Sequence, residues 1–86
     1  MATKAKYVVG EVPLAVGTRL MAVCIPECMN HADIRNLFAE PPISAGFFHI
    51  NHDQTISCYG ESISLQLKAD PQRDARLVAR DLALDI

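Results

Sequence analysis

The sequence predicts a small α+β domain, with an antiparallel sheet of four to five strands and two helices packed on one of its faces. Short runs of valine, isoleucine and leucine are bounded by glycine and proline, which is typical of strands. Two other segments carry the start and stop signals of helices. The 86 residues, half of them hydrophobic, suit one domain spanning residues 1–86 in the order β-β-α-β-β(-β)-α.

The first two strands are expected at Ala5–Val12 and Thr18–Ile25. Both are rich in apolar residues, and a proline and a glycine lie between them. After Arg19 the second strand is apolar at successive positions, so both of its faces are expected to be covered. That pattern predicts a central position in the sheet.

A short helix is predicted from His31 to about Glu40. Asn30 is a favourable N-cap, and Asp33 lies in the first turn, where a carboxylate favours the helix dipole. Two prolines end the segment. The expected buried stripe consists of Ile34, Leu37 and Phe38.

A hairpin is predicted next, with Phe48 and Ile50 on one face of its first strand and Ile56 and Cys58 on one face of its second. These apolar faces match only if Ile50 lies opposite Ile56, which requires a connection with an odd number of residues. We therefore expect a loop of three or five residues centred on Asp53.

The alternation Ile63-Ser64-Leu65-Gln66-Leu67 predicts a further half-buried strand. Its apolar positions are odd-numbered, whereas those of the preceding strand are even-numbered. A bulge or tight turn is therefore expected near Gly60-Glu61.

The last helix is predicted from Pro71 to about Leu84, with Asp70 as N-cap. Its expected core face contains Ala75, Val78, Ala79, Leu82 and Ile86. Leu77 and Leu84 are expected to point outward. They are flanked by arginines (Arg73, Arg76, Arg80) on one edge and aspartates (Asp74, Asp81, Asp85) on the other.

Composition and charge exclude several classes of protein. The net charge of −2 and the pI of about 5.8 do not fit a nucleic-acid binder. No apolar window approaches a membrane span, and Gly10, Glu11 and Pro13 interrupt the stretch that a signal peptide would need. Three cysteines make no disulfide framework. A cytoplasmic protein with neither nucleic-acid nor membrane partners is expected.

Two clusters of reactive residues suggest chemistry. Thiolates and imidazoles are zinc ligands, so one hypothesis is a metal site. Its ligands would be Cys24, Cys28 and His31, with His49, His52 or Cys58 as the fourth. The alternative is that Cys24 lies in the core and Cys28 in a loop. A small enzyme could instead use His49, His52 or Cys58, with Asp53 orienting an imidazole. The alternatives there are a polar hairpin tip and a buried cysteine.

The leading hypothesis is an interaction domain that binds a protein partner or a second copy of itself, without catalysis. Apolar side chains in excess of the core favour it, because exposed apolar stripes often mark interfaces; the alternative is an ordinary solvated helix face. A metal- or small-molecule-binding domain is the second hypothesis, and an enzyme is the third. No catalytic residue and no cofactor are assigned. The candidate interface residues are Phe47, Leu77, Leu84, Arg73, Arg80 and Asp81.

Overall fold

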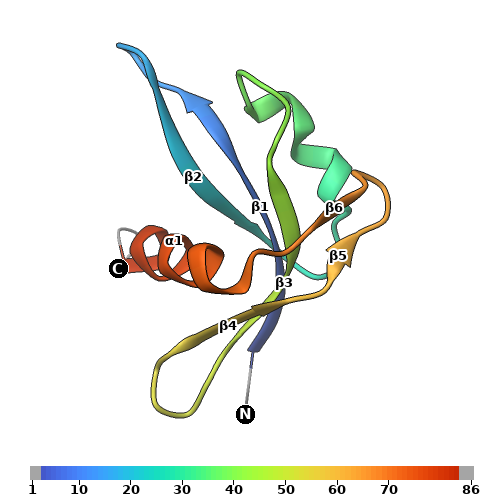
Figure 1. The fold of residues 1–86 in the computed structure, drawn as a ribbon, viewed down its shortest axis with the longest axis vertical. Coiled ribbons are helices and arrows are strands. Elements are labelled where there is room, and N and C mark those ends of the chain that lie inside the picture. The colour runs from blue at the N-terminus through green and yellow to red at the C-terminus, as the bar shows by residue number, and fades with distance from the viewer. Residues whose placement is uncertain (1–2, 84–86) are drawn as a thin grey trace.

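The computed structural model describes residues 3–83, which form two antiparallel sheets and two helices (Figure 1). The α+β class is therefore confirmed. The larger sheet contains β1 (Thr3–Pro13), β2 (Thr18–Ile25), β3 (Ser44–Ile50) and β4 (Ile56–Tyr59). The smaller sheet pairs β5 (Glu61–Ser62) with β6 (Leu67–Lys68). The helices are the 3₁₀ helix η1 (His31–Leu37) and the α-helix α1 (Pro71–Ala83).

The larger sheet has the order β2-β1-β3-β4, so β1 and β3 are its central strands. In this register Tyr7 lies opposite Gly46, and Val8 lies opposite Ala45. Because successive residues of a strand point to opposite faces, Tyr7 and Val8 belong to different faces of the sheet. The register thus assigns each neighbouring side chain to one of two layers.

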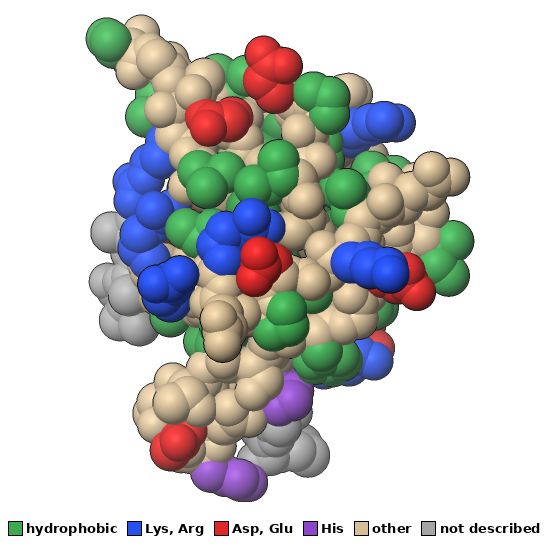
Figure 2. Space-filling view, viewed as in Figure 1, with side chains coloured by type: hydrophobic (Ala, Val, Ile, Leu, Met, Phe, Trp, Pro, Cys, Tyr) green, Lys and Arg blue, Asp and Glu red, His purple; other side chains and the backbone are tan. Residues whose placement is uncertain are grey.

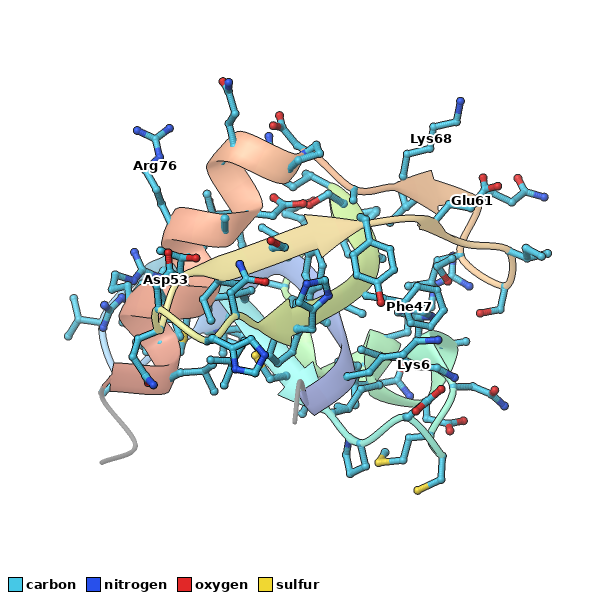
Figure 3. All side chains as sticks on the ribbon, turned by 90° about the horizontal axis from the view of Figure 1, so that it is seen from below. Lys6, Phe47, Asp53, Glu61, Lys68 and Arg76 are labelled. Atoms are coloured by element: carbon cyan, nitrogen blue, oxygen red, sulfur yellow. The ribbon has the colours of Figure 1, made fainter. Side chains whose placement is uncertain are left out.

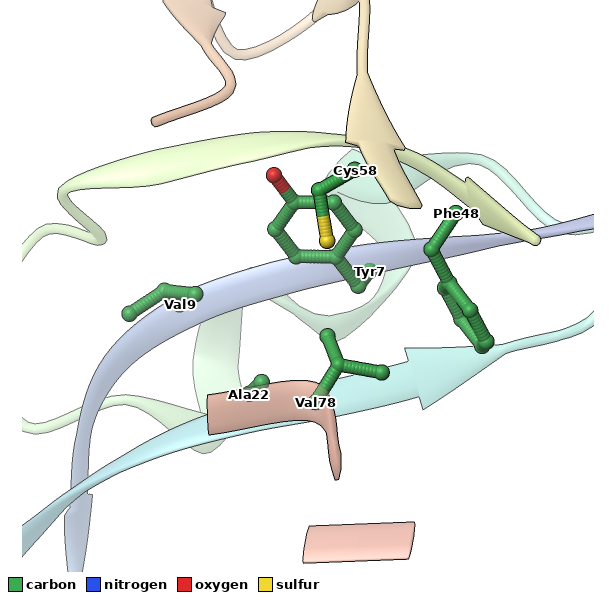
Figure 4. Close-up of a cluster of buried hydrophobic side chains, with 6 residues drawn as sticks. All are labelled: Tyr7, Val9, Ala22, Phe48, Cys58 and Val78. Atoms are coloured by element: carbon green, nitrogen blue, oxygen red, sulfur yellow. The ribbon is translucent and has the colours of Figure 1, made fainter. Parts of the chain in front are cut away.

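The two helices cover opposite faces of the sheet, so the expectation that both pack on one face was wrong. The cluster under α1 contains Tyr7, Val9, Ala22, Phe48, Cys58 and Val78 (Figure 4). The cluster on the other face, against η1, contains Val8, Ile25, Ile34, Phe38 and Ala45. β1 and β3 are apolar at both odd and even positions, and each of the two faces therefore needs its own cover.

β2 lies at the edge of the sheet, which corrects the central position predicted for it. Its outer edge is covered by side chains of α1. The backbone N–H of Ala22 donates to Asp81 Oδ2 at 2.8 Å, and Arg80 Nη2 donates to the carbonyl of Leu20 at 2.6 Å. Two polar groups of this edge strand are thus paired without another strand. Its side chains contribute to both core clusters, Ala22 to one and Ile25 to the other, which explains why its sequence resembles that of a central strand.

η1 begins at the predicted residue but is shorter than expected. The Asn30 N–H donates to the Asp33 carboxylate at 3.0 Å, as expected for the start of the segment. The chain then leaves the helical conformation at Phe38, whose backbone is extended (φ −98°, ψ 140°). This change directs Phe38 into the core and leaves Leu37 half-exposed, so Leu37 was wrongly placed in the buried stripe.

The β3–β4 hairpin has the predicted register. Ile50 lies opposite Ile56, and five residues connect them, centred on Asp53. The Asn51 N–H donates to the Thr55 carbonyl at 2.8 Å and closes the loop. The odd loop length follows from matching the apolar faces of the two strands.

The irregularity expected near Gly60 is present, but the strand expected after it is not. Gly60 has a φ of +80°, a left-handed conformation that favours glycine, and the chain leaves the larger sheet there. Two residue pairs, Glu61 with Lys68 and Ser62 with Leu67, flank a tight turn of residues 63–66, in which Ile63 is 86% exposed. The Leu65 N–H donates to the Ser62 hydroxyl at 3.2 Å. This local hydrogen bond to a side chain favours the turn, in competition with a longer strand.

α1 starts at Pro71 as predicted, but its buried face is rotated toward its aspartates. Asp74 and Asp81 are buried together with Val78, whereas Ala79 is exposed. Leu77 is partly buried against the core, so its predicted outward orientation was wrong. Buried carboxylates require hydrogen-bond donors, and the sheet supplies them. Three residues assigned to the last turn, Leu84, Asp85 and Ile86, lie outside the described residues.

Candidate functional site

Phe47 marks the face of the sheet that lies away from α1. The neighbouring Phe48 is 4% exposed in the core cluster beneath α1, whereas Phe47 is partly exposed on the other side. The prediction that the two rings point to opposite faces is confirmed. Figure 3 shows Phe47 beside Lys6, while Arg76 extends from α1 on the far side of the sheet.

The Phe47 ring is surrounded by aromatic and cationic groups. The His31 ring meets it edge-on, with ring centroids 5.6 Å apart, and Tyr59 stacks on it at 6.0 Å. The ammonium groups of Lys4 and Lys6 lie 4.9 and 6.0 Å from its centroid. Cations over an aromatic face are attracted by its quadrupole. The partly exposed Phe47 ring is therefore the centre of a surface formed by aromatic rings and ammonium groups.

A depression of about 630 Å³ opens beside this ring. Phe47 and Ile63 provide apolar walls, while Lys6 supplies an ammonium group, His31 an imidazole and Glu61 a carboxylate. Its lining residues are Lys6, Asn30, His31, Phe47, Gly60, Glu61, Ile63 and Ser64. The site thus combines segments from β1, η1, β3 and the turn between β5 and β6.

Backbone carbonyls hold the two basic side chains of the depression in place. Lys6 Nζ donates to the carbonyl of Met29 at 2.7 Å. His31 Nε2 bonds to the carbonyl of Gly46 at 2.8 Å, and the imidazole is only 5% exposed. Since a carbonyl only accepts, Nε2 of His31 carries the proton. Both groups are therefore pre-positioned.

The predicted zinc ligands are not brought together. Cys24 packs beside the core cluster under α1, whereas His31 lies on the opposite face of the sheet. Cys28 is exposed in the loop between them. Among residues 3–83, no group of three or more metal-ligating side chains lies close enough to bind an ion. The structure therefore does not support the metal hypothesis, because the sheet separates the thiol of Cys24 from the imidazole of His31.

The histidine loop does not form an acid–base pair. Asp53 Oδ1 accepts from the Thr55 hydroxyl at 2.6 Å and from its N–H at 3.0 Å, and these bonds lower the pKa of the Asp53 carboxyl. Asp53 therefore orders the loop instead of orienting an imidazole. His52 is exposed in that loop, and His49 lies against Tyr59 with ring centroids 5.6 Å apart. The polar hairpin tip is the interpretation that fits.

Cys58 is a core residue. It is 6% exposed and packs in the cluster with Tyr7 (Figure 4). Burial raises the pKa of the Cys58 thiol from its ordinary 9.0 to about 11, and the nearby charge of Asp74 acts in the same direction. A nucleophilic cysteine requires the opposite shift. The structure therefore does not support the nucleophile hypothesis for Cys58.

The raised pKa of the Cys58 thiol predicts that the protein loses stability at alkaline pH. Above about pH 9 the unfolded chain loses the thiol proton, while the folded protein keeps it up to about pH 11. The free energy of unfolding is therefore expected to fall by about 1.4 kcal/mol per pH unit across this window because of this group. Urea denaturation at several pH values measures it. Cys58→Ala should show a shallower fall, and equal slopes in the two proteins would contradict the assignment.

The candidate interface residues have different environments. Arg73 and Arg80 pair with the carboxylates of Asp74 and Asp81, at 3.2 and 2.8 Å, and Asp81 is buried. In Figure 2, basic side chains gather over α1, and histidines lie where the β3–β4 hairpin projects. Of the six candidates, Phe47 is the one that lines the depression; Leu84 lies outside the described residues.

The sequence interpretation did not identify Lys6 or Ile63 as site residues. One signal was present: Lys4 and Lys6 alternate along β1 and so share the face on which Phe47 lies. Nothing in the local sequence indicated that a turn would bring Ile63 to the same place.

The chain matches no known protein family, no curated protein and no solved structure. Among the helices of residues 3–83, none has the length and apolar character needed to cross a membrane.

Proposed function

We propose that this chain is a small cytoplasmic interaction domain that binds a protein partner through the surface around Phe47. We call this the Phe47 surface. It comprises Lys4, Lys6, His31, Phe47, Tyr59 and Ile63. The observation that carries the proposal is the open depression of about 630 Å³ beside a partly exposed aromatic ring.

The exposure of its apolar groups supports binding. Ile63 is 86% exposed and Tyr59 is 38% exposed, and both lie next to the Phe47 ring or its depression. Protein interfaces are enriched in aromatic anchors, surrounded by polar groups that exclude water when the partner docks. The Phe47 surface has both components, with lysine and histidine side chains beside the rings.

Catalysis has less support from the same groups. The residues considered for an enzyme lie in three environments, with Cys58 buried, His52 in an exposed loop and His49 against Tyr59. A general acid–base pair requires hydrogen-bond contact between its members. Binding requires only the exposed ring and its neighbours.

Two matched variants test this proposal. Ile63→Lys changes the Phe47 surface, whereas Val16→Lys changes a different hairpin tip, where the side chain is 91% exposed. Each replaces an exposed β-branched aliphatic residue by lysine, so the effect on folding should be similar and small, within about 0.5 kcal/mol. We expect Ile63→Lys to reduce capture of the native partner by about tenfold or more.

The measurement is the amount of partner protein captured from an extract of the native host by the wild type and by each of the two variants, in parallel. Light scattering on the same proteins determines whether the partner is a second copy of the chain. If Ile63→Lys and Val16→Lys retain every specific partner equally, the Phe47 surface is not the binding site. A loss confined to Val16→Lys would place binding on the β1–β2 hairpin instead.

A further inference from the structure

One nitrogen of His31 remains available to a ligand. Nε2 is bonded to the Gly46 carbonyl, so in the neutral imidazole the other ring nitrogen, Nδ1, is a hydrogen-bond acceptor. Among residues 3–83, no group donates a hydrogen bond to this atom. Every fully buried side-chain nitrogen or oxygen in this part of the chain has a hydrogen-bond partner, so Nδ1 is not fully buried. Nδ1 must therefore reach solvent, and His31 is one of the residues that line the depression.

Lys6 provides a positive charge without a paired anion. Its ammonium donates one hydrogen bond to the Met29 carbonyl, and an ammonium has three N–H donors. The ion pairs of the described residues include Lys4 with Glu27 but none of Lys6. Since Lys6 lines the same depression as His31, an anionic ligand group can approach it there.

The depression also has an apolar side. Phe47 and Ile63 line it together, and Ile63 is 86% exposed in the free protein. Burying an aliphatic side chain against these residues removes apolar surface from water and so favours binding. A complementary ligand therefore carries one negative charge, one hydrogen-bond donor and one apolar side chain.

We infer that the depression binds the C-terminal residue of a partner chain. Its carboxylate lies beside Lys6, its backbone N–H donates to His31 Nδ1, and an apolar side chain packs along Phe47 and Ile63. This inference rests on the proposed protein-binding function and specifies the segment that is recognised. Lys6 is the lysine that lines the depression, and the carboxylate of Glu61 lines it too, so a ligand group with one negative charge is repelled less there than a phosphate dianion.

Small probes separate the contact of the carboxylate from that of the N–H. N-acetyl-leucine carries all three groups, N-acetyl-leucinamide lacks the carboxylate, and N-acetyl-N-methyl-leucine lacks the N–H. Titration of each into the full chain, followed by amide NMR shifts of residues around Lys6, His31 and Phe47, measures affinity directly. We expect N-acetyl-leucine to bind at about millimolar strength, as suits so small a ligand. The other two should bind roughly tenfold more weakly.

A matched pair of lysine variants tests the charge. Lys6→Gln should weaken N-acetyl-leucine by about tenfold while leaving N-acetyl-leucinamide unchanged. Lys68→Gln, an exposed lysine on β6, should change neither. Unchanged shift patterns in the free variants show that both fold like the wild type.

The inference is overturned if N-acetyl-leucine shifts none of these signals, or if all three probes bind equally. It is also overturned if 4-methylpentanoate, a free carboxylate without an N–H, binds as well as N-acetyl-leucine, because the site then takes a small organic acid. If Ile63→Lys loses the partner while the probe does not bind, only this inference fails. If the probe binds while both hairpin-tip variants keep the partner, the proposed protein-binding function fails instead.

Discussion

Asp74→Asn is expected to lower the free energy of unfolding by about 3 kcal/mol. Asp74 is fully buried, and four donors converge on its carboxylate. Tyr7 Oη donates at 2.6 Å and the Asp70 N–H at 2.8 Å to Oδ2, while Ser44 Oγ at 3.0 Å and Arg73 Nε at 3.2 Å donate to Oδ1. Asparagine has nearly the same shape but turns one acceptor into a donor. Two donors, one of them a buried hydroxyl, would then lose their acceptor.

The same network affects the pKa of Tyr7. Burial raises the pKa of the Tyr7 hydroxyl, and the hydrogen bond to Asp74 raises it further. Tyr7 on the central strand and Asp74 on α1 are 67 positions apart in the chain, so this one bond connects the helix to the middle of the sheet. Its loss is expected to loosen the packing of α1 as well as to reduce stability.

Urea denaturation of Asp74→Asn beside Asp33→Asn provides the measurement. Asp33 is exposed and receives one backbone N–H at 3.0 Å, so its variant should lose less than about 1 kcal/mol. Tyr7→Phe and the double variant complete a thermodynamic cycle, whose coupling energy is expected to exceed about 1 kcal/mol. A loss for Asp74→Asn no larger than that for Asp33→Asn would show that the buried carboxylate is dispensable.

The parts of the fold that follow from local patterns could be predicted from the sequence. The β3–β4 register depends on the positions of Ile50 and Ile56, because a shift by one residue would move every apolar side chain to the wrong face. The start of α1 follows from Asp70 and Pro71, which satisfy the local requirements of a helix N-terminus. Both features involve residues that are close in the chain.

The predictions that were wrong concern features that depend on contacts between residues distant in the sequence. The buried face of α1 was assigned from apolar residues alone, which omitted Asp74 and Asp81 because charged residues are rarely buried without partners. Their donors, on β1, β3 and β2, are distant in the sequence. The apolar alternation after Gly60 likewise resembled one continuous strand. Residues 63–66 instead form a turn, and Leu65 in this turn and Leu67 in the short strand β6 both contact the second cluster.

The candidate site was predictable only in part. Phe47 was identified because adjacent phenylalanines in a strand must point to opposite faces. His31 was assigned to a metal site through its neighbours in sequence, whereas its partner in the fold is the Gly46 carbonyl. Which face of the sheet a loop residue reaches depends on the strand order, and the strand order could not be derived from the sequence.

Gly46→Ala is expected to destabilise the protein by about 2–3 kcal/mol and to disturb the Phe47 surface at the same time. A Cβ at Gly46 would lie 2.5 Å from the Tyr59 carbonyl oxygen and 3.1 Å from the Ala69 Cβ. The first contact is with backbone, so the end of β4 must move to relieve it. The Tyr59 ring stacks on Phe47, and the Gly46 carbonyl holds His31, so this movement alters two components of the site.

Gly10→Ala provides the matched comparison, because Gly10 also lies in a strand of the larger sheet and its Cβ would approach the Phe38 ring at 2.6 Å. That contact is with a side chain, which can shift while the backbone stays in place, so a smaller loss is expected. Urea denaturation ranks the two variants, and amide NMR shifts at Phe47 report on the site. If Gly46→Ala is the more stable of the two, or leaves the Phe47 signals unchanged, the close approach of β3 to Tyr59 does not position this surface.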